Sequence, residues 1–410
     1  MARRVYFHIG LPKTGTTFLQ TAMWHNRSQL RAQGFLYPGS KRMDHFHASQ
    51  VVRETPPDVL KGNADAWDRI VRELADWDGT GLISHEFFSM ATSAQARAAV
   101  AALGDAEVHV VVTARDYVRQ FPAVWQEALK MNSDLSLDEF MKKAFAFDLP
   151  GAWSWNTQDV PAVLANWAGA VTPDRVHVIT VPPPGAPRPV LWQRWCEVLG
   201  IDDSTFDMGL SFGNESLGAP QAALLHRIKP HLTEPLTQGP VRHRWVRQYF
   251  GHEVLVPQAG ERFGLRPQDA AELRQLSIAA ADAIDRAGYA VTGDLADLVP
   301  AEEQPVRPHP DDVTEGEMLD VAARAIDQMI RDVRELTDSR NDWRDRAKKQ
   351  QRRRPVGLAQ RVVRRAKRTW TRCLPRPHGP TRRRPPRCSS TTSSCGCRRR
   401  STPTPPTTSC

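Results

Sequence analysis

The chain has 410 residues, of which 40% are hydrophobic, so it can bury a core in one large domain or two ordinary ones. Its formal charge of +9 is concentrated at one end: residues 341–410 hold 21 Lys and Arg against 2 Asp, whereas residues 1–340 carry 34 basic and 44 acidic groups. The part that can fold is therefore acidic, which argues against a dedicated nucleic-acid-binding domain, and no specific nucleic acid is expected as a partner.

The amino terminus, MARRVYFHIGLPK, contains a short apolar run that Pro12 and Lys13 interrupt too early for a signal peptide. No later segment approaches the roughly 20 apolar residues of a membrane-spanning helix. Cys196 is the only cysteine before position 373, so no disulfide framework supports the core. We therefore expect a cytoplasmic protein without a membrane span.

The first half of the chain alternates strand-like and helix-like segments. RVYFHIG predicts a short buried strand, followed by a helix from Thr16 to about Gln33 that Gly34 can terminate. Continuous apolar runs, as in the further strand candidates, are typical of parallel strands covered on both faces. The pattern predicts an α/β fold, a P-loop-like doubly wound parallel sheet of about four or five strands with helices on both faces. The further strands are expected at 81–87, 108–115 and 175–182, and helices at 92–103, 117–131 and 158–170.

Beyond Pro189 the chain becomes mainly helical, and these helices are expected to pack on the sheet, so that residues 1–300 form one domain. A proline-rich linker is expected at 301–312 and an amphipathic helix at 313–350. This helix needs a partner for its apolar face, either its own domain or a second helix in a coiled coil, and the oligomeric state stays open. Its apolar positions alternate spacings of three and four residues: Leu319, Ala322, Ile326, Met329, Val333 and Leu336.

Residues 351–410 are rich in Arg, Pro, Ser and Thr and can bury too little apolar surface to offset the entropy of ordering, so we expect a disordered tail. Charge alone would give this tail a salt-sensitive affinity for nucleic acid or anionic lipid, but arginine runs in such segments are usually solvated. Cys395 and Cys397 lack a second pair of ligands, so no metal site is predicted there.

Residues 8–20, HIGLPKTGTTFLQ, look like a phosphate-binding loop with a displaced lysine. In the pattern G-x-x-x-x-G-K-[ST] the lysine follows the second glycine and reaches the β- and γ-phosphates of ATP. Gly10 and Gly15 keep the glycine spacing, but the lysine is Lys13, inside the loop. The amides at the start of the following helix still favour an anion. The shifted lysine therefore argues for an anion other than a γ-phosphate.

The segment PKTGTT, directly after a strand, resembles the 5′-phosphosulfate loop PK[ST]GTT of the sulfotransferases that use 3′-phosphoadenosine 5′-phosphosulfate (PAPS). The stretches WNTQDVPAVLANW, RVHVITVPPPG, WCEVLGI and NESLG are similar to those of actinobacterial sulfotransferase-like proteins, and the resemblance covers roughly residues 3–300. It implies sulfuryl transfer with PAPS as co-substrate. In NESLG, Ser216 is expected either to help close the nucleotide pocket or to cap a helix. The resemblance assigns the donor's 5′ side to Pro12, Lys13, Thr14, Gly15, Thr16 and Thr17.

A second block, VVVTARDYVRQFPAVWQE at 110–127, resembles the family's 3′-phosphate segment, in which an arginine at a strand end and a serine eight residues later bind the second phosphate. Arg115 matches the arginine, but Ala123 stands where the serine is expected. Loss of that hydroxyl contact costs about 1–3 kcal/mol unless Arg119, Gln120 or a backbone amide replaces it.

Sulfuryl transfer requires the protein mainly to align donor and acceptor and to neutralise charge on the bridging oxygen. A flexible ammonium at Lys13 suits this task, because the leaving group is a 5′-phosphate. The acceptor must also lose a proton, and ISHEFF offers two bases at one strand end, Glu86 and His85. The resemblance favours Glu86, as in glycan-modifying members, whereas a histidine serves in cytosolic small-molecule members. No metal is expected, because no γ-phosphate needs a magnesium clamp. His8, inside the first strand, is expected to be a satisfied core histidine.

Three functions are compatible with these residues. The first is a sulfotransferase that uses PAPS and a glycan, lipid or small-molecule acceptor. The second is a P-loop small-molecule kinase, and the third is a catalytically silent, sulfotransferase-like binding protein, to which Ala123 points. The sequence does not identify the acceptor, because substrate specificity in such folds resides in loops.

Overall fold

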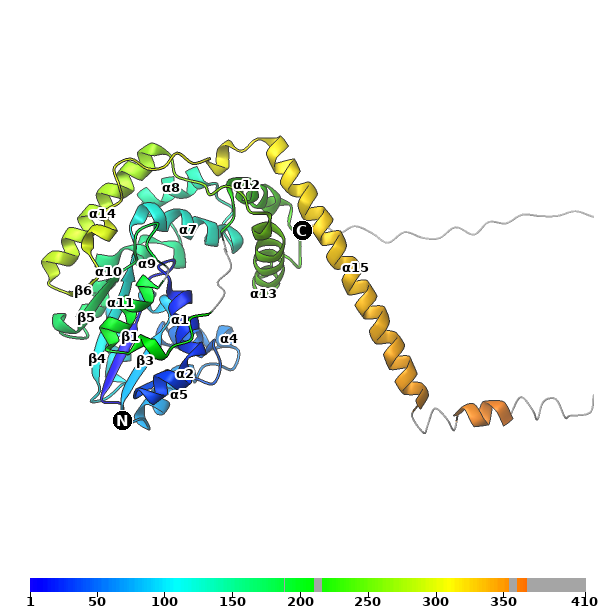
Figure 1. Ribbon diagram of the computed structural model, residues 1–410, viewed down its shortest axis with the longest axis horizontal. Coiled ribbons are helices and arrows are strands. Elements are labelled where there is room, and N and C mark those ends of the chain that lie inside the picture. Colours follow the sequence, from blue (N-terminus) through cyan, green and yellow to red (C-terminus); the bar gives the residue numbers. More distant parts are fainter. Residues whose placement is uncertain (188, 210–215, 354–359, 367–410) are drawn as a thin grey trace, which may run out of the picture. The chain divides into compact units, whose positions relative to one another are not determined.

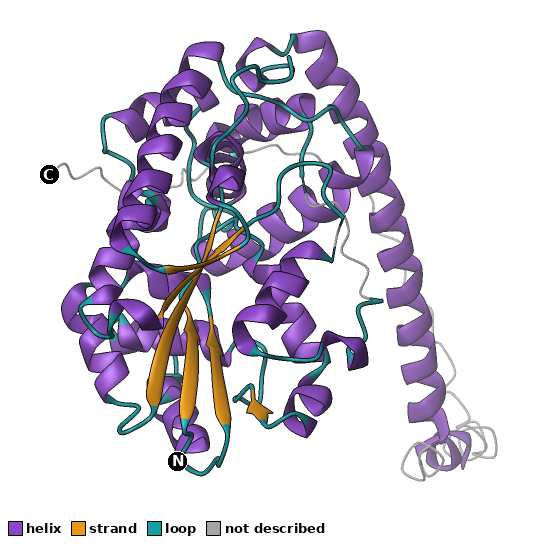
Figure 2. Ribbon diagram, turned by 60° about the vertical axis from the view of Figure 1, so that its left-hand side comes forward, coloured by secondary structure: helices purple, strands orange, loops and turns teal. Residues whose placement is uncertain are grey.

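Six parallel strands form one sheet in the computed structural model, which describes residues 1–187, 189–209, 216–353 and 360–366. The strand order is β2-β3-β1-β4-β5-β6, and every neighbouring pair is parallel. Figures 1 and 2 show helices on both faces of the twisted sheet, which confirms the doubly wound α/β class. The strands are β1 (Arg4–His8), β2 (Phe35–Leu36), β3 (Thr80–Ser84), β4 (Glu107–Ala114), β5 (Val176–Thr180) and β6 (Ala290–Thr292).

The sheet has two more strands than the four long apolar runs indicate. Both additional strands lie at its edges: β2 pairs with β3 alone, and β6 pairs with β5 alone. They are two and three residues long, so neither carries a readable periodicity. The expectation of four or five strands was therefore too low, for lack of signal at the edges.

The helices between and after the strands account for most of the remaining chain (Figure 1). Up to β5 they are α1 (Thr16–His25), α2 (Arg27–Ala32), α3 (Asp44–Val52), α4 (Pro57–Leu60), α5 (Ala66–Ala75), α6 (Ser93–Ala101), α7 (Tyr117–Lys130), α8 (Leu137–Phe145), α9 (Trp155–Gln158) and α10 (Val160–Ala168). After β5 they are α11 (Val190–Leu199), α12 (Ala219–Ile228), α13 (Gly239–Arg242), the π-helix η6 (His243–Leu255), α14 (Pro267–Ala287) and α15 (Glu315–Arg353).

The helix expected from Thr16 to Gln33 is broken in two at Asn26. The Asn26 side-chain amide donates to the carbonyl of Ala22 at 2.9 Å and to that of Asp207 at 3.0 Å, and its oxygen accepts from the Asp207 amide at 2.8 Å. These long-range bonds end α1 at His25, and α2 begins at the next residue after Asn26. A tertiary contact thus overrides a continuous helical pattern.

The alternation of side chains along β1 builds a separate core on each face of the sheet. Val5 and Phe7 point into a cluster with α5, α6, α10 and α14, whereas Tyr6 points into a cluster with α1 and α11. Both faces are apolar because helices cover both, as parallel strands require. A third cluster, which includes Trp125 and no strand residue, joins α7 and α8 to α12, η6 and α14.

The register of β1 fixes where the functional segments emerge. Arg4–His8 pairs with Thr80–Ser84 of β3 on one side and with Glu107–Val111 of β4 on the other. The chain leaves β1 toward the β2 edge and leaves β4 toward the β5 edge, so β1 and β4 flank the topological switch point. In open α/β sheets ligands bind outside the carboxyl ends of strands at such a point.

Gly10, just after β1, packs directly on the backbone that follows β3. Its φ is +111°, and a Cβ atom at this position would lie 2.8 Å from Glu86 Cα and 2.9 Å from the Glu86 carbonyl oxygen. Only glycine tolerates both the backbone conformation and this approach. The contact draws the end of β3 against the start of the loop.

The helix α15 buries a different face from the one that its spacing indicates. Val321 and Ala325 pack into the third cluster, whereas Leu319, Ile326 and Val333 are 69%, 57% and 61% exposed. Of the positions expected to seek a partner, Ala322 packs against the third cluster, and the others remain at the surface of the helix. No helix in the described part of the chain is both long enough and apolar enough to cross a membrane.

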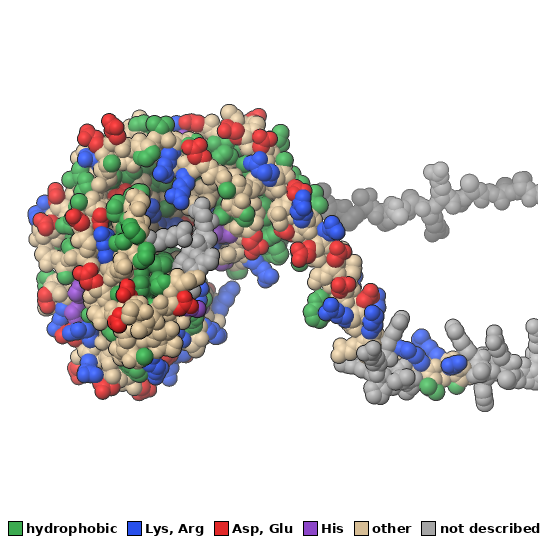
Figure 3. All heavy atoms as spheres, in the orientation of Figure 1, with side chains coloured by type: hydrophobic (Ala, Val, Ile, Leu, Met, Phe, Trp, Pro, Cys, Tyr) green, Lys and Arg blue, Asp and Glu red, His purple; other side chains and the backbone are tan. Residues whose placement is uncertain are grey.

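The chain divides into two compact units, Met1–Arg334 and Glu335–Cys410. In the first unit, acidic and basic side chains are interspersed over the face seen in Figure 3. Most of the expected tail, residues 354–359 and 367–410, lies outside the described residues, as does the pair Cys395 and Cys397.

Two buried histidines make stability depend on pH. Burial lowers the pKa of His8 to about 3 and that of His45 to about 4, whereas an unfolded histidine titrates near 6.5. The unfolded state therefore takes up protons first. We expect the free energy of unfolding to be highest above about pH 6.5 and to fall as the pH drops toward 4.

Urea unfolding at pH 7.5, 6.5, 5.5 and 4.5 measures this effect. His45→Gln should flatten the pH dependence, and His231→Gln, at an exposed histidine, should leave it as in the wild type. Equal stability at pH 7.5 and 4.5 would contradict the prediction.

The packing of Gly10 predicts an unequal response of two glycines to the same substitution. Gly34 also has a positive φ, +84°, but a Cβ atom there meets nothing within 4 Å. Gly34→Ala should cost about 1–2 kcal/mol of stability from backbone strain alone. Gly10→Ala should cost about 1–3 kcal/mol more, because the backbone of Glu86 must shift. Equal losses in urea unfolding would show that the close approach is unimportant.

Candidate active site

The loop between β1 and α1 offers a row of backbone N–H groups. Gly15, with φ +91°, occupies the position before the first residue of α1, and Lys13 also has a positive φ of +65°. The N–H groups of Gly15, Thr16 and Thr17 donate to no backbone acceptor among the described residues. Consecutive unpaired amides at a helix start, with the helix dipole behind them, attract an anion.

Buried hydroxyls fix the shape of this loop. Thr14 Oγ1 donates to the carbonyl of Leu11 at 2.6 Å and lies 2.6 Å from Thr113 Oγ1 of β4. The His8 ring lies between Ser84 Oγ, 2.8 Å from Nδ1, and Thr113 Oγ1, 3.3 Å from Nε2. His8 is fully buried, which confirms it as a core histidine. The loop is thus bonded to β4, while the His8 ring links β1 to both of its neighbouring strands.

The Lys13 ammonium ends in an ion pair. Its Nζ lies 2.9 Å from Glu127 Oε2, on the last turn of α7. Two further cations share this carboxylate: Lys130 Nζ at 3.2 Å from Oε2 and Arg247 Nε at 2.6 Å from Oε1. Burial alone would raise the pKa of Glu127, but the charges of the three cations lower it well below the usual range. Glu127 is therefore ionised at any physiological pH.

Arg115 follows β4 and lies beside the loop. One guanidinium nitrogen, Nη1, donates to the carbonyl of Lys13 at 3.2 Å, while its buried Nε has no acceptor among the described residues. Burial lowers the pKa of Arg115 to about 10, so it stays charged near neutral pH. An unpaired donor on a mostly buried cation is costly unless an anion binds it.

The residues near Arg115 differ in whether they have a polar group free to bind a ligand. The Arg119 guanidinium is bound to Asp116 and donates to the carbonyls of Val181 and Pro182, just after β5, and to that of Asp297, after β6. Gln120 is buried and donates to the carbonyl of Pro12 at 3.4 Å and to Gln158 at 2.8 Å. Ala123, half buried on α7, offers no polar atom.

Ser216 is exposed and lies just before α12. The next residue, Leu217, donates its amide to Gln126 Oε1 of α7 at 3.1 Å, so this segment runs beside the helix that carries Glu127. The alternative that Ser216 caps a helix is wrong, because Gly218 precedes the first residue of α12 and no side chain caps it. Asn214 and Glu215, the first two residues of the NESLG stretch, lie outside the described residues.

His85 and Glu86 follow β3 and face the loop with different hydrogen-bonding states. The amide of Phe87 donates to His85 Nδ1 at 3.1 Å, so the neutral ring carries its proton on Nε2. Glu86 Oε2 accepts from Gln20 Nε2 at 3.1 Å. Burial alone would raise the pKa of Glu86. The charges of His85 and Lys13, together with hydrogen bonds from the backbone and from Gln20, outweigh burial and lower this pKa. Glu86 is the group of the two with a free lone pair for a proton.

The sequence interpretation missed Glu127 and its two additional cations. Gln120, Ala123, Glu127 and Lys130 are spaced by three and four residues, so they share one face of α7, the face that meets the loop. The three polar residues Gln120, Glu127 and Lys130 on one face of this helix were a usable signal. Arg247 comes from η6, more than a hundred residues away, and nothing local indicates its position.

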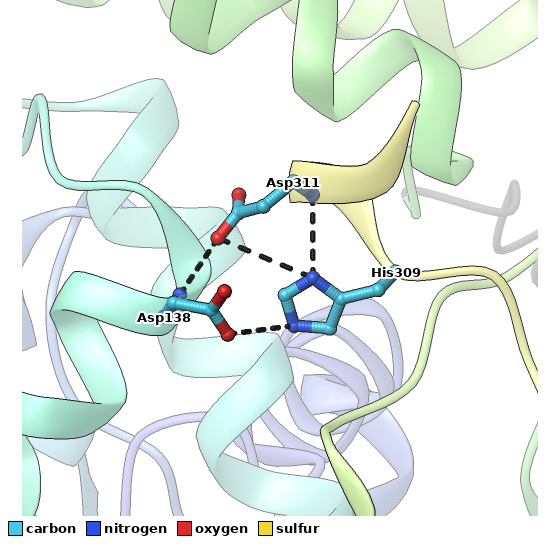
Figure 4. A group of neighbouring side chains, drawn as sticks. All are labelled: Asp138, His309 and Asp311. Carbon is cyan, nitrogen blue, oxygen red and sulfur yellow. Dashed lines mark hydrogen bonds and ion pairs between the residues drawn. The ribbon is translucent and has the colours of Figure 1, made fainter. Parts of the chain in front are cut away.

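A second polar cluster, Asp138, His309 and Asp311, has the composition of a metal site (Figure 4). Asp311 accepts from the amides of Leu137 and Asp138 at the start of α8. His309 Nδ1 accepts from the Asp311 amide at 3.3 Å, and Nε2 lies 3.4 Å from Asp138 Oδ1. The buried Nε2 has no hydrogen-bond partner among the described residues, whereas Nδ1 and the Asp311 carboxylate are used in these bonds. The Asp311 carboxylate ties residues 309–312 to the start of α8.

Comparison with known proteins gives a structural likeness but no match in sequence. No family model matches the chain, and no curated protein matches it. Among solved structures the chain is similar to a sulfotransferase from Alicyclobacillus acidocaldarius, at 19% sequence identity, over 52% of this chain and 88% of that chain, with a TM-score of 0.36. A likeness of this size carries no information about the reaction or the substrates of this chain.

Proposed function

We propose that the chain is a sulfotransferase that moves the sulfuryl group of PAPS to a hydroxyl or amine of a glycan, lipid or small-molecule acceptor. The observation that carries this proposal is the position of Lys13 inside a loop of unpaired amides at the switch point of the sheet. A lysine there reaches the bridging oxygen of a 5′-phosphosulfate rather than the γ-phosphate of a triphosphate.

The proposed reaction is a single displacement at sulfur. The acceptor oxygen or nitrogen forms a bond to sulfur, the bond from sulfur to the 5′-phosphate oxygen breaks, and adenosine 3′,5′-bisphosphate leaves. The amides of residues 13–17 hold the phosphosulfate, and the Lys13 ammonium stabilises the charge that develops on the bridging oxygen. Thr16 and Thr17 follow directly at the helix start, where their amides face the same anion.

Arg115 binds the 3′-phosphate of the donor in this proposal. Its unpaired Nε gives it a donor that no described protein group uses. Arg119 does not replace the missing serine, because its donors are engaged at the end of β5. Ala123 therefore leaves the 3′-phosphate with one contact fewer than the family pattern supplies. Ser216 closes the pocket from the α12 side.

The acceptor proton goes to Glu86. Its carboxylate is ionised and lies at the end of β3, where Gly10 packs against its backbone. His85 is the weaker candidate, because its Nδ1 lone pair is already used by the Phe87 amide. A carboxylate base within reach of the acceptor contributes a rate factor of about 10²–10⁴.

The donor site is tested by binding. Adenosine 3′,5′-bisphosphate should bind in isothermal titration without added metal, and Mg-ATP should bind far more weakly. Lys13→Ala should lower the rate of bisphosphate release with a reactive acceptor by about 10²–10³-fold. Lys61→Ala is the matched control, since Lys61 is an exposed lysine with a positive φ of its own.

Tight Mg-ATP binding without bisphosphate binding would make the chain a kinase. Bisphosphate binding without turnover on any acceptor of a broad panel would make it a silent binding protein.

The assignment of the base is tested by two substitutions at neighbouring positions. Glu86→Gln should lower kcat by about 10²–10⁴-fold while bisphosphate affinity changes little, because the amide cannot take the proton. His85→Gln should lower kcat less than about tenfold. Since the pKa of Glu86 lies below its usual value, the wild-type rate should keep its plateau down to about pH 5. The reverse ranking of the two variants would assign the base to His85.

A further inference from the structure

In the empty site the ammonium of Lys13, the proposed catalytic cation, is paired with the Glu127 carboxylate. A carboxylate 2.9 Å from the ammonium neutralises the charge that sulfuryl transfer needs. The Lys13 side chain is still 29% exposed, and the described residues give its ammonium this one ion pair. The pairing must therefore be broken, or at least shared, when the donor binds.

The other two cations around Glu127 make such a release inexpensive. Lys130 Nζ already lies 3.2 Å from Oε2, the oxygen that Lys13 uses, and Arg247 Nε lies 2.6 Å from Oε1. A nearly buried carboxylate left without a partner is strongly destabilising. Here each oxygen keeps a cation after Lys13 departs, so no charge is left unpaired.

The two additional cations are themselves held in place. The Lys130 side chain is 2% exposed, and its stem lies against Gly251 of η6, where a Cβ atom would come within 3.5 Å of Lys130 Cδ. Its ammonium also lies 3.4 Å from His252 Nε2. Arg247 comes from the same π-helix. Helix η6 therefore helps to fix Glu127, directly through Arg247 and indirectly through the packing of Lys130.

We propose that Glu127 is a positioning residue that holds the Lys13 ammonium in the empty site and releases it to the phosphosulfate of the donor, with Lys130 and Arg247 taking over the carboxylate. This inference rests on the proposed function. It adds that the donor must break an internal ion pair in order to bind. The site therefore binds the donor less tightly than it would if the Lys13 ammonium were unpaired.

A charge-balanced pair of substitutions tests the competition. Glu127→Gln combined with Lys130→Met removes one negative and one positive charge, so the net charge near the polyanionic ligand is unchanged. The double variant should bind adenosine 3′,5′-bisphosphate roughly tenfold more tightly than the wild type, because Lys13 is already free. In a Lys13→Ala background the same pair of changes should leave the affinity unaltered.

The outcomes separate this inference from the function on which it depends. Equal tightening with and without Lys13, or no tightening at all, overturns the role of Glu127 and leaves the sulfotransferase proposal intact. Absence of bisphosphate binding in the folded wild type overturns both. Glu127→Gln alone, whose amide can still accept from Arg247, is the second variant if the double one unfolds, and thermal unfolding of each variant checks its fold.

Discussion

The parallel register of β1 with β3 and β4 is the constraint on which the candidate site depends. Because the three strands end at the same edge, the loop after β1, the Glu86 carboxylate after β3 and the Arg115 guanidinium after β4 meet there without any long connection. Gly10 tightens this arrangement through its backbone contact with Glu86. The site is therefore a product of sheet topology first and of side-chain chemistry second.

The electrostatics of the site follow from how few of its charges are solvated. Burial lowers the pKa of Arg115, whereas the charges of neighbouring cations outweigh burial at Glu127 and lower its pKa. Around Glu127, three cations face one carboxylate, and this excess of positive charge is what an anionic ligand would neutralise. Residues 1–340, in which acidic groups outnumber basic ones, thus keep a local cationic centre at the loop.

The sequence predicts the parts of this structure that have local signals. Long apolar runs locate β1, β3, β4 and β5, and the glycine spacing locates the anion-binding loop. The edge strands and the break at Asn26 depend on contacts with distant segments, which no window of sequence contains. In the site, Lys13, Glu86 and Arg115 follow predicted strands, whereas Arg247 reaches Glu127 from 120 positions further along the chain.

The hydroxyl of Thr14, bonded to Leu11 and adjacent to Thr113, gives the loop its final shape before any ligand arrives. Binding therefore does not have to order a segment of backbone, and little conformational entropy is lost on association. The part that must move is one lysine side chain, and such rotations take picoseconds to nanoseconds, far less than the microseconds to milliseconds of a closing lid.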